Sequence, residues 1–145
     1  MVSIDLSGKL AVVTGASGEL GRVIARTLAE AGADVAVHYR GSVEKAEATA
    51  DAIRALGRRT MIVQADITDE ASVFAMRDAI AADLGAPDII VNNAVIQYNW
   101  VSVLEQAVED YDGQYKSCVI HNVLMAKAFV PAMIEKGGGR VIATN

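Results

Sequence analysis

Cysteine, basic residues and long apolar runs are all scarce in this chain of 145 residues. The single cysteine, Cys118, cannot form a disulfide within the chain, so a reducing compartment is expected. Acidic residues outnumber basic ones by 18 to 13, and the absence of a basic stripe argues against nucleic-acid binding. The N-terminus lacks the pattern of a secretion signal, and no apolar run reaches the roughly 18 residues that cross a bilayer. We therefore expect a cytoplasmic protein that binds neither nucleic acid nor membrane.

Short, continuously apolar segments recur along the chain and alternate with helix-like patterns. Such runs are typical of strands that are covered on both faces. The expected strands are residues 9–14, 34–39, 60–65, 88–93 and 140–144. Helices that end at glycines are expected between them, with a loop and a short helix over 96–113 and a long apolar helix over 115–135. This alternation predicts an α/β fold, a doubly wound parallel sheet of the Rossmann type, in one domain over 1–145.

The stretch VVTGASGELGR, residues 12–22, places three glycines at three-residue spacing directly after the first expected strand. Gly15 would permit a tight turn, Gly18 would let the backbone approach a pyrophosphate, and Gly21 would let the following helix pack closely. The N-terminus of that helix would supply N–H donors and partial positive charge. An ordinary tight turn is the plain alternative, and S-adenosylmethionine or a flavin are alternative ligands. We interpret the loop as a dinucleotide site.

The end of the second expected strand indicates which dinucleotide would bind. Sites that hold a free ribose usually place an acidic residue there. The segment from Val35 to Val43 contains no acid, but it does contain Arg40 and Ser42. A guanidinium and a hydroxyl group suit a 2′-phosphate, which predicts NADP and disfavours NAD. The alternative is an arginine that is merely exposed to solvent in a loop.

Four segments occur in the order and at the spacing of a known family. They are LSGKLAVVTGASGELGR at 6–22, ADIT at 65–68, VNNA at 91–94 and AFVPAMIEKGGGRVI at 128–142. These motifs span nearly the whole chain. In them the chain resembles the short-chain dehydrogenase/reductase family, and most of all its 3-oxoacyl-acyl-carrier-protein reductase-like members. The resemblance implies an NADP-dependent oxidoreductase of the carbonyl reductase or alcohol dehydrogenase type. It also implies a small carbonyl or alcohol substrate and a homo-oligomer.

The resemblance also implies cofactor contacts at particular positions. Those at the pyrophosphate would be Gly15, Ser17, Gly18, Leu20 and Gly21. Asp66 would accept a hydrogen bond from the adenine amino group, with Ile67 beside the ring. For Asp66, a role in a turn or a helix cap is the alternative. Asn93 and Ala94 would lie along the adenosine ribose side of the cofactor. We assign neither a metal ligand nor a catalytic residue.

Three positions depart from the commonest pattern of the family. Glu19 stands where the pattern TGxxxGxG has a glycine, so this loop reads TGxxGxxG and carries a negative charge near the pyrophosphate. Val95 replaces the glycine of NNAG and would narrow the space near the nicotinamide ribose. Cys118 falls at the position of the asparagine of the catalytic helix, while Asn122 lies one turn later on the same face. We interpret Cys118 as a small buried residue rather than a nucleophile.

The reaction of this family also requires a serine and a tyrosine–lysine pair in YxxxK spacing. That spacing places both side chains on one helix face, where the ammonium lowers the pKa of the tyrosine. No tyrosine in this sequence has a lysine four residues later. We therefore expect the cofactor half of a longer reductase, truncated after the fifth strand. The alternatives are a dinucleotide-binding module without redox activity, and a flavodoxin-like signalling domain that would leave the glycine loop unexplained.

Overall fold

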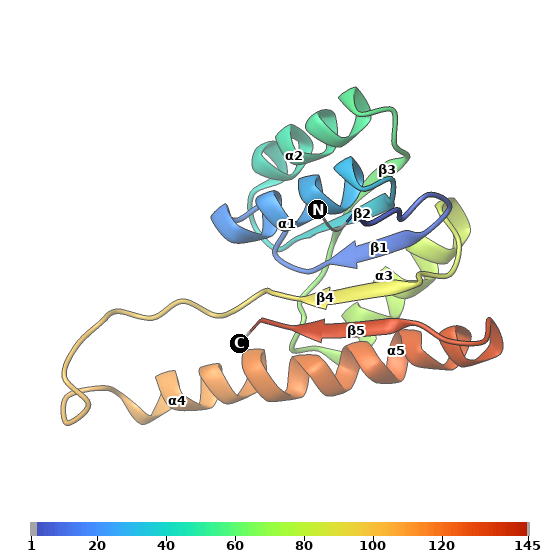
Figure 1. The fold of residues 1–145 in the computed structure, drawn as a ribbon. Helices are drawn as coiled ribbons and strands as arrows, with labels where there is room; N and C mark the ends of the chain where they lie inside the picture. The colour runs from blue at the N-terminus through green and yellow to red at the C-terminus, as the bar shows by residue number, and fades with distance from the viewer. Residues whose placement is uncertain (1–2, 145) are drawn as a thin grey trace.

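The computed structural model describes residues 3–144 and contains a parallel sheet of five strands. The strands are β1 (Leu10–Val13), β2 (Asp34–Tyr39), β3 (Thr60–Gln64), β4 (Ile89–Asn92) and β5 (Arg140–Ala143). Their order across the sheet is β3-β2-β1-β4-β5 (Figure 1). The chain builds outward from β1 to β3 and then returns to the other side of β1. This is the predicted doubly wound arrangement, and each expected strand is present, β2 with the expected bounds and the other four slightly shorter.

Helices cover both faces of the sheet, which explains why the strands are apolar throughout. On one face lie α1 (Glu19–Glu30) and α2 (Val43–Ala55), and on the other lie α3 (Glu70–Asp83) and α5 (His121–Glu135). Side chains alternate between the two faces along a strand. In β1, Val13 therefore packs in the core beneath α1 and α2, whereas Val12 packs in the core beneath α3 and α5.

Helix ends follow the predicted signals closely. The helices α1, α2 and α3 each end two residues before a glycine with positive φ, and these glycines are Gly32, Gly57 and Gly85. At the start of α3 the capping side chain is Asp69, which accepts a hydrogen bond from the Ser72 N–H at 2.7 Å. An acidic side chain at this position also suits the partial positive charge at the start of the helix.

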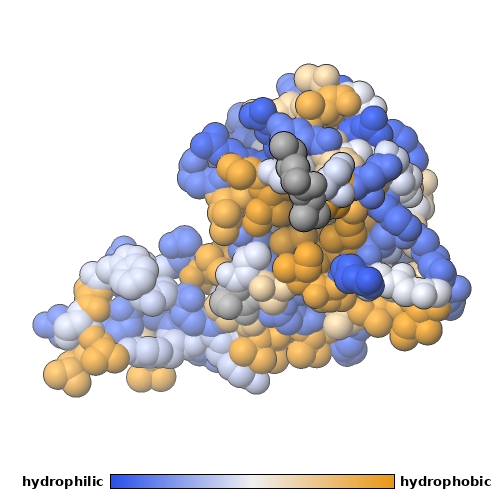
Figure 2. Space-filling model, in the orientation of Figure 1, coloured by the Kyte–Doolittle hydropathy of each residue, from blue (hydrophilic) through white to orange (hydrophobic). Residues whose placement is uncertain are grey.

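The last helical stretch begins earlier than the sequence predicted. It starts with α4 (Val108–Tyr115), passes through a π-helical segment, η1 (Lys116–Ile120), and continues as α5. The irregular segment 93–107 and α4 project beyond the end of the sheet (Figure 1). None of the residues of α4 is buried. At the projecting end, Figure 2 shows apolar side chains on the surface, and the exposed residues there include Val103, Leu104 and Val108.

This continuous helix also bears on the expectation that no membrane is involved. From Val108 to Glu135 it comprises 28 residues with a mean hydropathy of 1.5, so its length and composition would suffice to cross a membrane. Core helices of globular proteins share these properties. In α5, Leu124, Met125, Phe129 and Met133 are buried against the sheet and α3, as in such a core helix.

Candidate functional site

A cleft of about 630 Å³ lies at the carboxyl ends of β1 and β4. The strand order reverses between these two strands, and ligands of doubly wound sheets bind at such points. Among the residues that line the cleft are the predicted contacts Gly15, Ser17, Gly18, Leu20, Gly21, Arg40, Ile67, Asn93 and Ala94. The other two predicted contacts, Ser42 and Asp66, lie outside the lining. The topology therefore brings most of the predicted residues together in one cleft.

Two glycines of the loop are required by its own packing. Gly15 has a φ of 66°, and a Cβ atom there would lie 3.0 Å from the Ala94 Cα. Gly21 packs against the loop itself, because a Cβ atom at this position would lie 2.1 Å from the Gly15 carbonyl oxygen. Gly18 has an ordinary φ of −84°, and a Cβ atom there would meet only the Gly15 oxygen, at 3.3 Å. The fold thus explains Gly15 and Gly21, whereas Gly18 leaves open space towards the cleft.

The N-terminus of α1 differs from those of its neighbours. Ser42 caps α2 and Asp69 caps α3 through side-chain oxygens, but among residues 3–144 no side chain caps α1. Gly18 occupies the capping position. The first N–H groups of a helix have no partner within the helix and carry partial positive charge. The start of α1 can therefore receive an anionic group at the cleft.

Thr14 and Asn93 fasten the ends of β1 and β4 together. The Thr14 Oγ1 accepts hydrogen bonds from the main-chain N–H groups of Asn93 at 2.9 Å and Ala94 at 3.0 Å. The Asn93 side chain donates to the Thr14 carbonyl oxygen at 3.0 Å. Thr14 is fully buried. The amide of Asn93 thus has a structural role in addition to the cofactor contact that the resemblance implies.

Arg40 follows β2 and stands at the rim of the cleft with 64% of its side chain exposed. Its guanidinium is 3.2 Å from the Asp66 carboxylate. The other carboxylate oxygen of Asp66 accepts from the Thr68 side chain at 2.6 Å and from the Thr68 main chain at 2.9 Å. The hydrogen bond from the Thr68 side chain, helped by Arg40, lowers the pKa of Asp66 although partial burial opposes this. The turn role considered for Asp66 is therefore present in the structure.

Ser42 has a local role that the sequence analysis did not assign. Its hydroxyl oxygen accepts a hydrogen bond from the Lys45 N–H at 3.4 Å and so caps α2. A contact with a 2′-phosphate would require the Ser42 side chain to line the cleft, but Ser42 is not among the lining residues. The reason is that the first turn of α2 requires an acceptor at this position.

The sequence pattern of the short chain dehydrogenase family matches residues 9–145. The chain belongs to this family. The 3-oxoacyl-(acyl-carrier-protein) reductase FabG of Staphylococcus aureus is 48% identical over 88 residues, which are 61% of this chain and 36% of that protein.

Solved structures agree with this assignment. L-sorbose reductase from Gluconobacter frateurii, complexed with NADPH and L-sorbose, has a TM-score of 0.88 at 31% identity, over 98% of this chain and 54% of that one. A 7α-hydroxysteroid dehydrogenase complexed with NADH and 7-oxo glycochenodeoxycholic acid has a TM-score of 0.88 at 31% identity, over 97% and 54%. This short-chain dehydrogenase chain thus spans between 36% and 54% of the length of these relatives.

Two of the departures from the pattern of the short-chain dehydrogenase family lie in the cleft lining. The carboxylate of Glu19 forms an ion pair with Arg22, one turn further along α1, and both side chains are well exposed. The negative charge near the start of α1 is therefore offset locally. Val95 lines the cleft and is partly exposed, and its expected effect on the space near a nicotinamide ribose stays a prediction.

The third departure is Cys118 at the position of the family's asparagine, and it lies in the π-helical segment η1 just before Asn122. Asn122 accepts a hydrogen bond from the Asn92 side chain at the end of β4, at 2.7 Å, and donates to the Cys118 carbonyl oxygen at 2.6 Å. The side chain of Asn122 therefore contacts the end of β4. The extra residue in the π turn shifts the helix register by one position. The thiol of Cys118 is only partly buried, which corrects the expectation of a buried residue.

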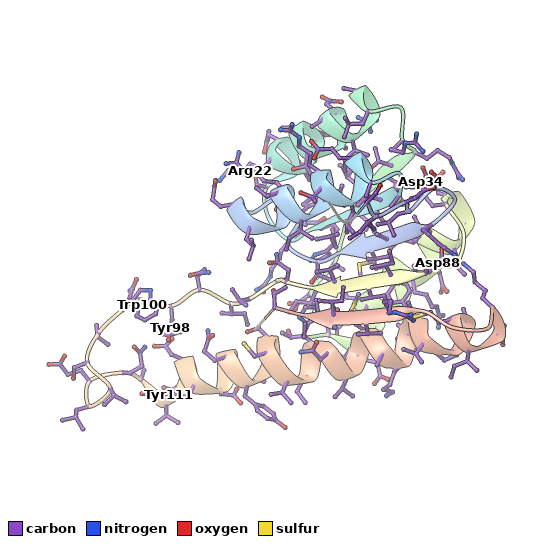
Figure 3. The ribbon with its side chains drawn as sticks, viewed as in Figure 1. Arg22, Asp34, Asp88, Tyr98, Trp100 and Tyr111 are labelled. Atoms are coloured by element: carbon purple, nitrogen blue, oxygen red, sulfur yellow. The ribbon has the colours of Figure 1, made fainter. Side chains whose placement is uncertain are left out.

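The segment after β4 carries two aromatic residues, Tyr98 and Trp100. The rings of Tyr98 and Trp100 contact each other with their centroids 5.7 Å apart, and Trp100 is 87% exposed. Both lie on the projecting segment, away from the sheet (Figure 3).

At the opposite, amino ends of the strands, Asp88 accepts from the Leu10 N–H at 2.9 Å and pairs with Lys136 at 2.9 Å. That end of the sheet is held by a structural carboxylate.

Sequence reasoning missed three polar residues of the cleft, His38, Gln97 and Thr144. His38 is the most informative, because it is 1% exposed and its ring bonds to the glycine loop. A signal for it was present in the sequence. It is a polar side chain that directly follows the apolar run Val35–Val37, near the end of a strand that leads to the cleft.

Proposed function

We propose that this chain is the cofactor-binding part of an NADP-dependent oxidoreductase of the carbonyl reductase or alcohol dehydrogenase type. Family membership supports oxidoreductase chemistry, and the complexes of related proteins with NADPH and NADH support a nicotinamide dinucleotide as the ligand. When bound, that cofactor supplies or accepts a hydride at its nicotinamide ring. Because the chain spans about half of its relatives, the activity of the whole protein and its carbonyl or alcohol substrate belong to the proposal.

The cleft fits such a dinucleotide at two positions. The uncapped start of α1, with Gly18 as its first flanking residue, would hold the pyrophosphate. Arg40 at the rim would hold a 2′-phosphate on the adenosine ribose. Tyr39 and Arg40 stand at the end of β2, where NAD-binding sites usually carry an acid. Arg40 at the cleft rim is the observation that carries the preference for NADP over NAD.

The expected size of this preference follows from the surroundings of Arg40. A well-formed charge-assisted hydrogen bond contributes about 1.5–3 kcal/mol. Arg40 is 64% exposed, so solvent weakens the interaction, and its ion pair with Asp66 must be shared with the phosphate. We therefore expect the lower end of the range, which corresponds to roughly tenfold in affinity.

The test is a titration of NADP⁺ and NAD⁺ against the wild-type chain, Arg40→Ala and Arg26→Ala. Arg26 is the matched control, because its side chain is also 64% exposed and pairs with one carboxylate, that of Glu30 at 2.8 Å. Arg40→Ala should weaken NADP⁺ binding about tenfold and leave NAD⁺ binding within about twofold. Arg26→Ala should change neither. Equal affinities of the wild type for the two cofactors, or full NADP⁺ affinity in Arg40→Ala, would refute the preference.

A second candidate function is a dinucleotide-binding module without redox activity. The observation that favours it is the lack of any tyrosine followed four residues later by a lysine. The two candidates are distinguished by measuring NADPH oxidation by this chain with simple aldehydes and ketones. The candidates agree that these residues alone give no turnover, so sustained oxidation would contradict both. A reading frame that continues into a serine and a YxxxK pair would decide for the reductase.

A further inference from the structure

His38 joins the carboxyl ends of three strands at the floor of the cleft. Its ring Nδ1 lies 2.9 Å from the main-chain nitrogen of Gly15, and its Nε2 lies 3.0 Å from the Ala65 carbonyl oxygen. Its own carbonyl oxygen accepts from the Ala16 N–H at 2.9 Å. Gly15 and Ala16 belong to the loop after β1, whereas Ala65 follows β3. A single buried residue of β2 therefore holds the first half of the glycine loop.

The partners of the ring determine its protonation state. The Gly15 N–H can only donate, so Nδ1 must offer a lone pair. The Ala65 carbonyl can only accept, so Nε2 carries the proton. A second proton on Nδ1 would face the Gly15 N–H and break that hydrogen bond. Only the neutral Nε2–H form therefore satisfies both contacts.

The surroundings of the ring act on its charge in opposite directions. Burial lowers the pKa of His38, while the Asp66 carboxylate, from the connection after β3, raises it. His121, at the start of α5, also faces this region, and burial lowers its own pKa to about 4. Arg40, two residues after His38, is paired with Asp66. The neutral form therefore prevails at neutral pH, and protonation sets in as the solution becomes acidic.

The contact matters for the cleft because it determines where the loop leaves β1. Gly15 has a φ of 66°, so the chain turns sharply at the residue whose N–H bonds to His38. Thr49 of α2 holds the next residue from the other side, through a hydrogen bond of 3.1 Å to the Ala16 carbonyl oxygen. Gly18 and the first N–H groups of α1 follow within a few residues. A displaced Gly15 would shift the N–H groups that are proposed to meet the pyrophosphate.

We propose that His38, neutral with its proton on Nε2, is the positioning residue of the glycine loop, and that dinucleotide affinity falls when this ring is protonated. This inference rests on the proposed dinucleotide binding. His38 touches the loop and acts on the cofactor through it.

The first test needs no cofactor. Nuclear magnetic resonance of the free chain, labelled with nitrogen-15, reports the tautomer of His38 and the shift of the Gly15 amide. We expect an unprotonated Nδ1 at pH 7.5, and a Gly15 amide shift that titrates together with the ring as the pH falls below 6.5. A proton on Nδ1 at pH 7.5, or a Gly15 amide that ignores the titration of the ring, would overturn the proposal.

The second test compares His38→Asn with His38→Leu. The asparagine Oδ1 occupies the place of the histidine Nδ1 and can accept from Gly15, whereas leucine fills the space without an acceptor. His38→Leu should weaken NADP⁺ binding about tenfold or more at pH 7.5, because a buried donor loses its partner, and His38→Asn should stay within about threefold of the wild type. The titration of the 2′-phosphate of NADP⁺ contributes equally to the affinities of the wild type and of the variants. The ratio of wild-type to His38→Asn affinity should therefore fall with pH only through His38.

The outcomes separate this inference from the proposed function. Equal losses in the two variants, or a wild-type to His38→Asn ratio that stays constant over the pH range in which nuclear magnetic resonance shows the His38 ring to titrate, would overturn the positioning role. If no variant binds any dinucleotide, the proposed function and the predicted effect on affinity both fail, while the Gly15 titration still decides the hydrogen bond. Circular dichroism of each variant shows whether it folds. If His38→Leu does not fold, the pH ratio and the nuclear magnetic resonance titration carry the test.

Discussion

Replacing Gly21 by alanine tests the close packing of the glycine loop on α1. The added Cβ atom would lie 2.1 Å from the Gly15 carbonyl oxygen, 2.7 Å from its carbon and 2.8 Å from the Asn93 Nδ2. Two of these three contacts are with backbone, so the loop and the helix must move apart. Overpacking of this kind costs about 1–3 kcal/mol. Alanine is also the better helix former by about 1 kcal/mol, so the net loss of unfolding free energy should be somewhat smaller.

The matched control is Gly113→Ala in α4. Gly113 also lies within a helix, and a Cβ atom there would meet only the Ile96 Cγ2, at an ordinary 3.8 Å. Both variants gain helix propensity, so the difference between them isolates the clash. Gly113→Ala should be neutral or stabilising by up to about 1 kcal/mol.

The assay is urea unfolding followed by circular dichroism, because Trp100, the single tryptophan, is 87% exposed and reports poorly on the core. We expect Gly21→Ala to fall below Gly113→Ala by about 1–3 kcal/mol in unfolding free energy. Its affinity for NADP⁺ should fall as well, since the first turn of α1 moves. If Gly21→Ala is as stable as Gly113→Ala, the packing described for the loop is wrong.

Three further predictions concern other parts of the chain. Burial lowers the pKa of His121 from 6.5 to about 4, so the unfolded chain takes up a proton first as the pH falls. The free energy of unfolding should therefore drop by roughly 3 kcal/mol from pH 6.5 to pH 4. The control is His121→Asn, in which this loss should be absent. Asp88→Ala should cost about 1–3 kcal/mol of unfolding free energy, because it removes the acceptor of a main-chain N–H, while NADP⁺ affinity at the opposite end of the sheet stays unchanged in a titration. Finally, the exposed side chains of Val119 and Val123 should promote self-association of the chain. Sedimentation should therefore show a smaller species for the double variant Val119→Glu, Val123→Glu than for the wild type. A wild type that is monomeric at all concentrations would contradict this.

The family resemblance implies a homo-oligomer, and the structure divides the apolar surface of the long helix into a buried part and an exposed part. Leu124, Phe129 and Met133 pack in the core beneath α3 and α5. Val119 and Val123 remain exposed. The sequence could not separate the two groups, because the helix is apolar on most of its circumference. The sheet decides which side becomes core.

Local patterns were sufficient for the architecture. Continuous apolar runs predicted strands that are covered on both faces, and glycines predicted the helix ends, because both signals act within a few residues. The loop glycines were also readable, since Gly15 and Gly21 meet demands that their own neighbourhood imposes. The family resemblance extended this to the positions that line the cleft.

Only the tertiary structure decided how distant side chains share the site. Asp66 pairs with Arg40, 26 residues away, and His38 meets Gly15 across 23 residues, because β2 lies between β1 and β3. Asn122 reaches Asn92 because a π turn shifts the helix register, which no local pattern announced. Sequence periodicity specifies the elements and their buried faces. Strand order and register bring particular polar groups within hydrogen-bonding distance, and those are properties of the assembled sheet.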